Sequence, residues 1–248
     1  MKNSRFLPAL MGALAPIPTA LGASLLVTNP SFEDPAIPAG TFLTTAPPAG
    51  WSNYGYIESF AGRDVGVLHP ATTSLYTDPA PSGNNVAVVF LLTGGPTESG
   101  LQQTLTDALQ TGMSYTLNVH VGNIAPDGGP FNFAGFPGYR VDLMAGGQIL
   151  ASDNNSLLPG EGRFLESTVS FTTGATHPLV GQLLGIRLVS LDGPSGIEVN
   201  FDNVRLEAQA VAVPEISGTC GWVGLGLGVW AIRRRRAPRR GRPSQAAG

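Results

Sequence analysis

Cysteine, charge and catalytic motifs are all scarce in this sequence. Its single cysteine, Cys220, excludes a disulfide framework and a cysteine-rich zinc site. Charged residues make up 12% of the 248 residues, whereas a typical globular domain has about a quarter. The three histidines (His69, His120 and His177) are isolated, and no Gly-x-Ser-x-Gly or Gly-Lys-Ser/Thr motif occurs. The sequence therefore predicts a protein that is not an enzyme.

The hydrophobic content of 42% supports one folded domain with a core. Residues 24–209 hold 16 of the 17 Asp and Glu residues but only five of the 14 Lys and Arg residues. Nucleic-acid phosphates repel so acidic a body, which excludes non-specific nucleic-acid binding.

The N-terminus has the three-part layout of a secretory signal peptide. Lys2 and Arg5 precede an uncharged apolar stretch over 6–20, and small residues follow at 20–23. Prolines in this stretch disfavour a spanning helix, and equally the alternative of a helix buried in the fold. We expect residues 1–23 to be removed on export.

The C-terminal segment 210–248 contains a short motif, an apolar run and a basic tail. The run of 17 uncharged residues, 216–232, is just long enough to span a membrane. The basic tail over 233–242 marks the cytoplasmic side. The alternative, a core helix with a nucleic-acid-binding tail, leaves the secretion signal unexplained. The motif is Val213, Pro214 and Glu215, and the tail opens with Arg233, Arg234, Arg235 and Arg236.

This arrangement resembles the PEP-CTERM sorting signal of Gram-negative bacteria, in which a Pro-Glu-Pro motif precedes a membrane helix and an arginine cluster. Ile216 stands in place of the family's second proline. The resemblance implies processing by an exosortase-type enzyme. It also implies an inner-membrane anchor with the domain outside, followed by release to the cell surface or medium.

Between the two ends, apolar and polar residues alternate in short runs. The runs 115–121, 139–143, 169–171 and 184–188 alternate, whereas 86–92 is continuously apolar. Alternation with a period of two is typical of antiparallel strands with one buried face. Gly- and Pro-rich turns separate about nine to eleven such strands. The fold class predicted is all-β, an antiparallel β-sandwich or jelly roll, over residues 24–209.

Several short motifs resemble those of galactose-binding-like and carbohydrate-binding jelly rolls. The chain opens with Asn29-Pro30-Ser31-Phe32-Glu33, continues with Gly50-Trp51, and closes with Phe-Asp-Asn-Val-Arg-Leu over 201–206. This resemblance implies the jelly-roll fold rather than an activity. An association with extracellular polysaccharide is implied by analogy to the PEP-CTERM sorting class.

The closing strand also predicts a bulge. Val199 and Phe201 are out of phase with Val204 and Leu206, so one residue is inserted near Asp202. A carboxylate buried there is costly unless it is paired, and Ca²⁺ is one solution. The resemblance implies a structural Ca²⁺ between Glu33 and Asp202. The alternative is a hydrogen-bonded Asp202 with Glu33 in solvent.

Two groups of loop aromatics are candidates for stacking on sugars, although loop aromatics also pack onto their own core. The first group is Phe131, Phe133, Phe136 and Tyr139, and the second is Trp51, Tyr54, Tyr56 and Phe60.

Three functions follow from the sequence. The leading one is an exported, non-catalytic surface or matrix protein associated with exopolysaccharide. The second is a specific glycan-binding module. The third is a small glycoside hydrolase, with its paired carboxylates drawn from residues such as Glu161, Glu166 and Glu198.

Overall fold

The structure, a computed structural model, describes residues 22–55, 63–71, 73–91, 98–126, 133–191 and 197–211. The predicted signal peptide, apart from Gly22 and Ala23, and the C-terminal motif, helix and arginine tail lie outside the described residues. In the described part of the chain, no helix is long and apolar enough to cross a membrane.

All the regular elements within these ranges are antiparallel β-strands. They are β1 (Ala23–Leu25), β2 (Phe42–Leu43), β3 (Ser52–Tyr54), β4 (Arg63–Leu68), β5 (Val86–Leu91), β6 (Glu98–Ala108), β7 (Met113–Asn123), β8 (Tyr139–Ala145), β9 (Gln148–Asn154), β10 (Arg163–Thr172), β11 (Leu183–Leu191) and β12 (Ile197–Ala210). The strands expected at 86–92, 115–121, 139–143, 169–171 and 184–188 are confirmed. Three of the additional strands, β1, β2 and β3, have only two or three residues, below the length that a pattern reveals. The other additional strands, β4, β6 and β9, have six, eleven and seven residues.

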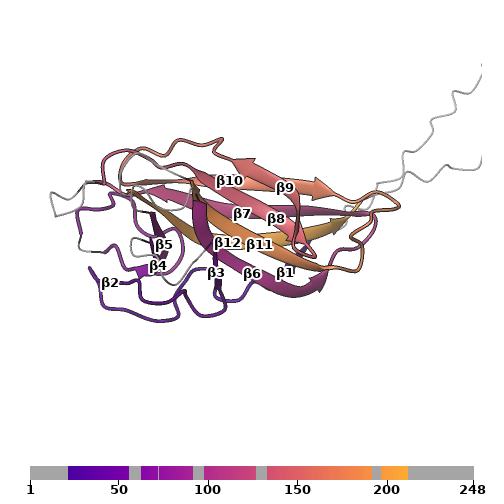
Figure 1. Cartoon of the computed structure of the whole chain (residues 1–248), viewed down its shortest axis with the longest axis horizontal. Helices are drawn as coiled ribbons and strands as arrows, with labels where there is room; N and C mark the ends of the chain where they lie inside the picture. The colour runs from indigo at the N-terminus through magenta and orange to yellow at the C-terminus, as the bar shows by residue number, and fades with distance from the viewer. Residues whose placement is uncertain are drawn as a thin grey trace, which may run out of the picture. The chain divides into compact units, whose positions relative to one another are not determined.

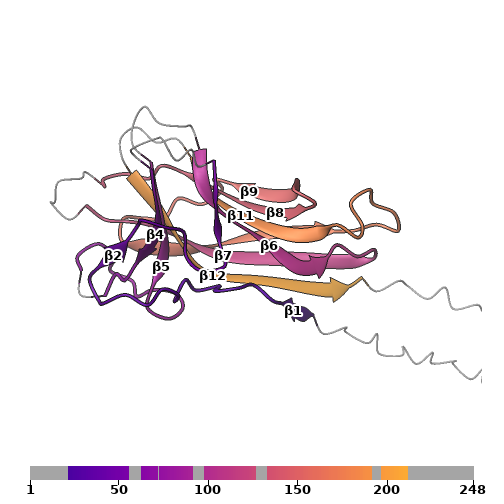
Figure 2. The same ribbon diagram turned by 60° about the horizontal axis from the view of Figure 1, so that its bottom comes forward.

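The strands form two sheets that face each other. Sheet A has the order β10-β7-β12-β5-β4-β2, with β1 also paired to β12, and sheet B has the order β3-β6-β11-β8-β9. Figure 1 shows the strands in their sheets, and Figure 2 shows β9, β8, β11 and β6 on one side of β7, β12 and β1. The predicted antiparallel β-sandwich is therefore confirmed.

The core lies between the sheets and contains the apolar members of each alternating strand. Leu117, Val119 and Val121 of β7 face Leu143 of β8 and Ile186 of β11 within one buried cluster. Burying a side chain of this size stabilises the fold by about 1.5–3 kcal/mol. The alternation in the sequence thus defines the inner face of both sheets.

A second buried layer covers the outer face of sheet A. Leu68, Val86, Val88, Phe90 and Ile124 form an apolar cluster there, together with Tyr76. This explains why all six residues of β5 are buried, since β5 lies between β12 and β4 and is covered on both faces.

The predicted bulge is present in β12. The register with β7 shifts between Asp202 and Arg205, and Asn203 has a φ of 54°. The inserted residue returns Val204 and Leu206 to the core while Asp202 stays on the outer face.

Candidate functional site

Three polar residues alternate on the outer face of β12, and all three are buried. Glu198 is 7% exposed, and Asn200 and Asp202 are 0% exposed. Val199 and Phe201 between them face the core. A buried polar side chain costs free energy unless its groups are bonded, so this face of β12 is where a functional site is expected.

The register places Asn200 in the middle of a row of residues across sheet A. Phe164 of β10 lies opposite Gly122 of β7, which lies opposite Asn200, which in turn lies opposite Val88 of β5. A Cβ atom on Gly122 would lie 2.3 Å from Phe164 Cε1 and 2.7 Å from Tyr76 Oη. Gly122 therefore allows the rings of Tyr76 and Phe164 to lie directly over the sheet.

Aromatic side chains lie beside Glu198 and Asn200. Tyr76 and Phe164 are stacked with centroids 4.5 Å apart, and Phe90 and Phe133 meet edge-on at 6.4 Å. Phe90 is the direct cross-strand neighbour of Glu198. We call Tyr76, Phe90, Phe133 and Phe164 the aromatic cluster. It offers a flat, polarisable surface beside a carboxyl group.

A chain of hydrogen bonds joins Tyr76 to Glu198 through Asn200. The Tyr76 hydroxyl donates to Asn200 Oδ1 at 2.6 Å, and Asn200 Nδ2 donates to Glu198 Oε1 at 2.9 Å. Burial raises the pKa of Tyr76 well above 10.0, and the charge of Glu198 adds to this effect. Tyr76 is therefore a hydroxyl donor throughout the ordinary pH range.

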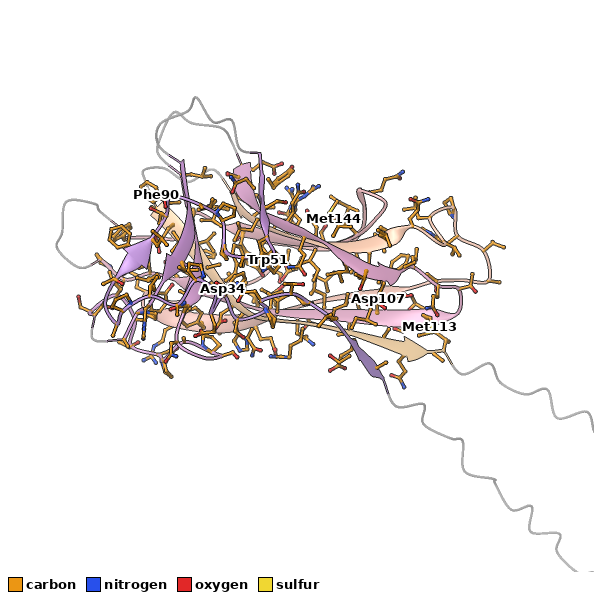
Figure 3. The ribbon with its side chains drawn as sticks, turned by 90° about the horizontal axis from the view of Figure 1, so that it is seen from below. Asp34, Trp51, Phe90, Asp107, Met113 and Met144 are labelled. Atoms are coloured by element: carbon orange, nitrogen blue, oxygen red, sulfur yellow. The ribbon has the colours of Figure 1, made fainter. Side chains whose placement is uncertain are left out.

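This group lies towards one end of the sandwich. The register brings the start of β12, the end of β5 and the start of β4 together there, with the end of β7 beside them. Figure 3 shows Phe90 at this end, and Asp107 and Met113 towards the other.

Glu33 and Asp202, the predicted calcium ligands, both accept hydrogen bonds from the turn over residues 82–85. Glu33 Oε1 accepts hydrogen bonds from the N–H groups of Asn84 and Asn85, each at 2.7 Å, and Asp202 Oδ2 accepts one from Ser82 at 2.7 Å. Gly83 of this turn has a φ of 72°, and a Cβ there would lie 2.5 Å from Glu33 Oε1. The structure thus brings the two carboxylates to one place.

The buried position of Asp202 disfavours its ionised form. Burial raises its pKa from 3.8 to about 8, and the Glu33 carboxylate adds to the rise, although N–H groups of Ser82 and Asn203 oppose it. Asn85 Oδ1, beside Glu33, is buried without a hydrogen-bond partner. No group of three or more His, Cys, Asp or Glu residues suited to a metal occurs among the described residues. A cation here would need amide, backbone or water oxygens besides the two carboxylates.

The outer face of sheet B has a polar network and a cavity. The Arg140 guanidinium donates to Glu98 Oε2 at 2.6 Å and to both Asp142 oxygens at 3.1 Å. Burial lowers the pKa of Arg140, but the two carboxylates outweigh it and raise the pKa. The Arg140 hydrogen bond in turn lowers the pKa of Glu98. With Arg187, which lies 3.8 Å from Asp142 Oδ2, two guanidinium groups balance the two carboxylates, which favours a structural role.

The cavity beside this network has a volume of about 310 Å³ and is lined by Gln102, Met144, Gln182, Gly185 and Arg187, among others. Its lining contains no carboxyl, imidazole, thiol or phenol group. This cavity therefore lacks a carboxylic acid that could donate a proton, whereas Glu198 lies beside Phe90 of the aromatic cluster.

The predicted sugar-stacking aromatics are dispersed. Phe133 joins the aromatic cluster, but Tyr139 is fully buried in the core and donates to Asp153 Oδ2 at 2.5 Å. Phe136 packs against Tyr139. Trp51 packs on Phe32 and donates to the Asn29 carbonyl at 3.2 Å. Arg187 lies over the Tyr54 ring, 3.9 Å from its centroid. Phe131, Tyr56 and Phe60 lie outside the described residues.

The other candidate residues are also separated. Glu161 accepts a hydrogen bond from the Gly135 N–H, and Glu166 pairs with Arg205. The His69 ring contacts the Ile37 carbonyl, and the His177 ring packs on Phe171. From the sequence, Glu198 was only one of several candidate carboxylates for a glycoside hydrolase. The sequence does not show that the polar face of β12, which carries Glu198, is covered by a second buried layer.

Comparison with known proteins identifies similar chains. The family model described as HpiC1-like, HpiC1 cyclase, matches residues 23–207. The Stig cyclase Fisc from Fischerella sp. TAU, solved with (3Z)-3-(1-methyl-2-pyrrolidinylidene)-3H-indole, is 35% identical with a TM-score of 0.71. The match covers 77% of this chain and 100% of that one. A cyclase from Fischerella sp. TAU, solved with 4-(1H-indol-3-yl)butan-2-one, is 36% identical with a TM-score of 0.69. The match covers 77% and 100% of the two chains. No curated protein sequence matches.

These matches correct the functional predictions. The matching family and structures are cyclases. The prediction of a non-catalytic, exopolysaccharide-associated protein that is not an enzyme is therefore wrong. The glycan-binding alternative is wrong for the same reason. The identification as a PEP-CTERM protein, and with it the exosortase-substrate and membrane-helix descriptions, is overturned by the same finding.

The motifs that suggested a sugar-binding family have structural roles. Phe32 and Phe201 are fully buried in the core. The Asn29 side chain donates to the carbonyls of Asp34 and Ala49 and so ties the opening loop together. Such residues build a jelly roll whatever its activity, and they do not identify a ligand.

Proposed function

Because the chain belongs to the HpiC1-like cyclase family, we propose that it closes a ring in an indole substrate with an unsaturated side chain, with Glu198 as the proton donor. The observation that carries this proposal is the buried Glu198 carboxyl beside Phe90 and within the aromatic cluster. The indole compounds bound to two of the matched cyclases support the substrate class.

The proposed reaction is an isomerisation. The Glu198 carboxyl transfers a proton to an unsaturated carbon of the substrate, and a second double bond attacks the resulting cation to form the new carbon–carbon bond. The ring-closed cation then loses a proton to the Glu198 carboxylate. Atoms and electrons balance without an oxidant or a reductant.

The aromatic cluster suits such an intermediate. A cation over the face of an aromatic ring is stabilised by about 0.5–2 kcal/mol. The rings also exclude water, which would otherwise capture the cation. Positioned proton transfer contributes on the order of 10²–10⁴ to a rate, which sets the scale of the loss expected when Glu198 is changed.

The test is turnover of indoles with alkenyl side chains, followed by chromatography and NMR for a product of unchanged mass. Glu198→Gln should lower the rate by roughly 10²-fold or more, and Glu198→Asp should retain part of it. Glu161→Gln is the matched control, because Glu161 contacts only the exposed Gly135 N–H in the described hydrogen bonds. Full activity of Glu198→Gln would exclude the proposal.

We further propose that a Ca²⁺ ion binds between Glu33 and Asp202. The carboxylates of Glu33 and of the buried Asp202 bind the same turn, and together with the unpaired Asn85 Oδ1 they form a set of oxygen donors that suits Ca²⁺. The turn leads directly into β5, which carries Phe90. The ion would therefore hold the strand that supports the aromatic cluster.

Calcium should raise the free energy of unfolding by mass action, by about 2.7 kcal/mol at a concentration 100 times the Kd, and so raise the melting temperature. Asp202→Asn should remove this response, while Asp78→Asn, which changes an acidic residue paired with Arg163, should keep it. Equal melting temperatures in calcium and in chelator would contradict the calcium site.

We also propose that residues 1–23 are an export signal, supported by the charge pattern of the N-terminus. Intact-mass analysis of the mature protein should show their loss, and a mature protein that retains them would contradict export.

A further inference from the structure

We propose that Asn200 is a positioning residue that orients the Glu198 carboxyl, so that its transferable proton is carried by Oε2, and that Tyr76 holds Asn200 in place. This inference rests on the proposed function of Glu198 as proton donor.

The orientation of the Asn200 amide is fixed by its surroundings. Asn200 is fully buried, and its Nδ2 lies 3.0 Å from the Ala87 carbonyl oxygen. A carbonyl only accepts hydrogen bonds, so the atom of Asn200 that faces it must be the nitrogen. The Tyr76 hydroxyl then donates to Oδ1. All the hydrogen-bonding groups of the amide have defined partners.

The second N–H of this amide orients the Glu198 carboxyl group. It donates to Glu198 Oε1 at 2.9 Å. The carbonyl oxygen of a neutral carboxyl group is a better acceptor than its hydroxyl oxygen. Asn200 therefore favours the form in which Oε1 is the carbonyl and Oε2 carries the proton.

Tyr76 supports this arrangement from the opposite side. Its ring is stacked on Phe164, and Gly122 leaves room for both. Its hydroxyl is the donor that Asn200 Oδ1 requires. Loss of that hydroxyl would leave the amide held by two bonds in place of three, with its orientation retained by Ala87 but its position loosened.

The experiment measures the rate of ring closure of an alkenyl indole as a function of pH in the wild type and three variants. Asn200→Ala should lower kcat by about 10-fold or more with a smaller change in KM. It should also move the alkaline limb of the profile, where a proton donor loses its proton, to higher pH, because the Glu198 carboxylate loses a hydrogen-bond donor. Tyr76→Phe, which keeps the ring, should shift the limb in the same direction by less. Asn123→Ala is the control for lost stability, because it removes a buried asparagine bonded to the Pro159 carbonyl, and its pH profile should be unchanged.

The outcomes separate this inference from the proposed function. In the Glu198→Gln background, Asn200→Ala should cause no further loss of kcat. If Glu198→Gln abolishes turnover but folded Asn200→Ala keeps the kcat and pH profile of the wild type, the positioning role is refuted and the proton donor stands. If Glu198→Gln keeps full turnover, the proposed function itself fails.

Discussion

Replacing Gly122 by alanine should displace the stacked pair over the sheet. The new methyl group would lie 2.3 Å from Phe164 Cε1 and 2.7 Å from Tyr76 Oη, so at least one ring must move by about an ångström. Overpacking of this kind costs about 1–3 kcal/mol. Weakening the Tyr76–Asn200 hydrogen bond adds roughly 0.5–1.5 kcal/mol. We expect a total loss of about 2–4 kcal/mol in the free energy of unfolding.

Urea unfolding measures this loss directly. Gly160→Ala is the matched control, because a Cβ there would meet only Arg163 Cγ at 3.8 Å. The double variant Gly122→Ala with Phe164→Ala should be more stable than the sum of its single changes predicts, by about 1 kcal/mol or more. Additive effects, or a Gly122→Ala protein as stable as the wild type, would refute the packing of Tyr76 and Phe164 over Gly122.

Two further predictions concern Asp153, whose carboxylate joins β9 of sheet B to Ser167 of β10 in sheet A, and the binding of substrate. Burial alone would raise the pKa of Asp153, but hydrogen bonds donated by Ser167, Tyr139 and Ser156 outweigh it and lower the pKa below 3.8. The ionised carboxylate therefore stabilises the fold above pH 3.8, and this stability is lost as the pH falls through the lower, folded value. Melting temperatures between pH 6 and pH 2 should fall more steeply for wild type than for Asp153→Asn, and parallel curves would contradict the hydrogen-bonded carboxylate. Phe90→Ala should weaken binding of 4-(1H-indol-3-yl)butan-2-one in calorimetry by 10-fold or more, whereas unchanged binding would place the ligand elsewhere.

The main strands could be predicted from the sequence because alternation reports the inner face of a sheet. Val199 and Phe201 against Val204 and Leu206 even revealed the bulge. The pattern does not report what covers the outer face. Glu198 and Asn200 have the spacing of solvent-facing residues, yet the segment that carries Tyr76 and the β5 side chains bury them.

The function could not be predicted for a related reason. A single carboxyl among aromatic rings has no sequence motif, because Tyr76, Phe90, Phe133, Phe164 and Glu198 come from five separate parts of the chain. The motifs that are visible, such as Asn29 to Glu33, build the fold and the turn at Ser82. They indicated a jelly roll correctly and its activity wrongly.

The most direct test of the account is ring closure of an alkenyl indole in D₂O. If the Glu198 carboxyl protonates a carbon of the substrate, its exchangeable deuteron should appear in the product as a single carbon-bound deuterium, located by NMR. Glu198→Gln should form this labelled product more slowly by roughly 10²-fold or more. Unlabelled product from the wild type, or labelled product from Glu198→Gln at the wild-type rate, would contradict proton transfer from Glu198.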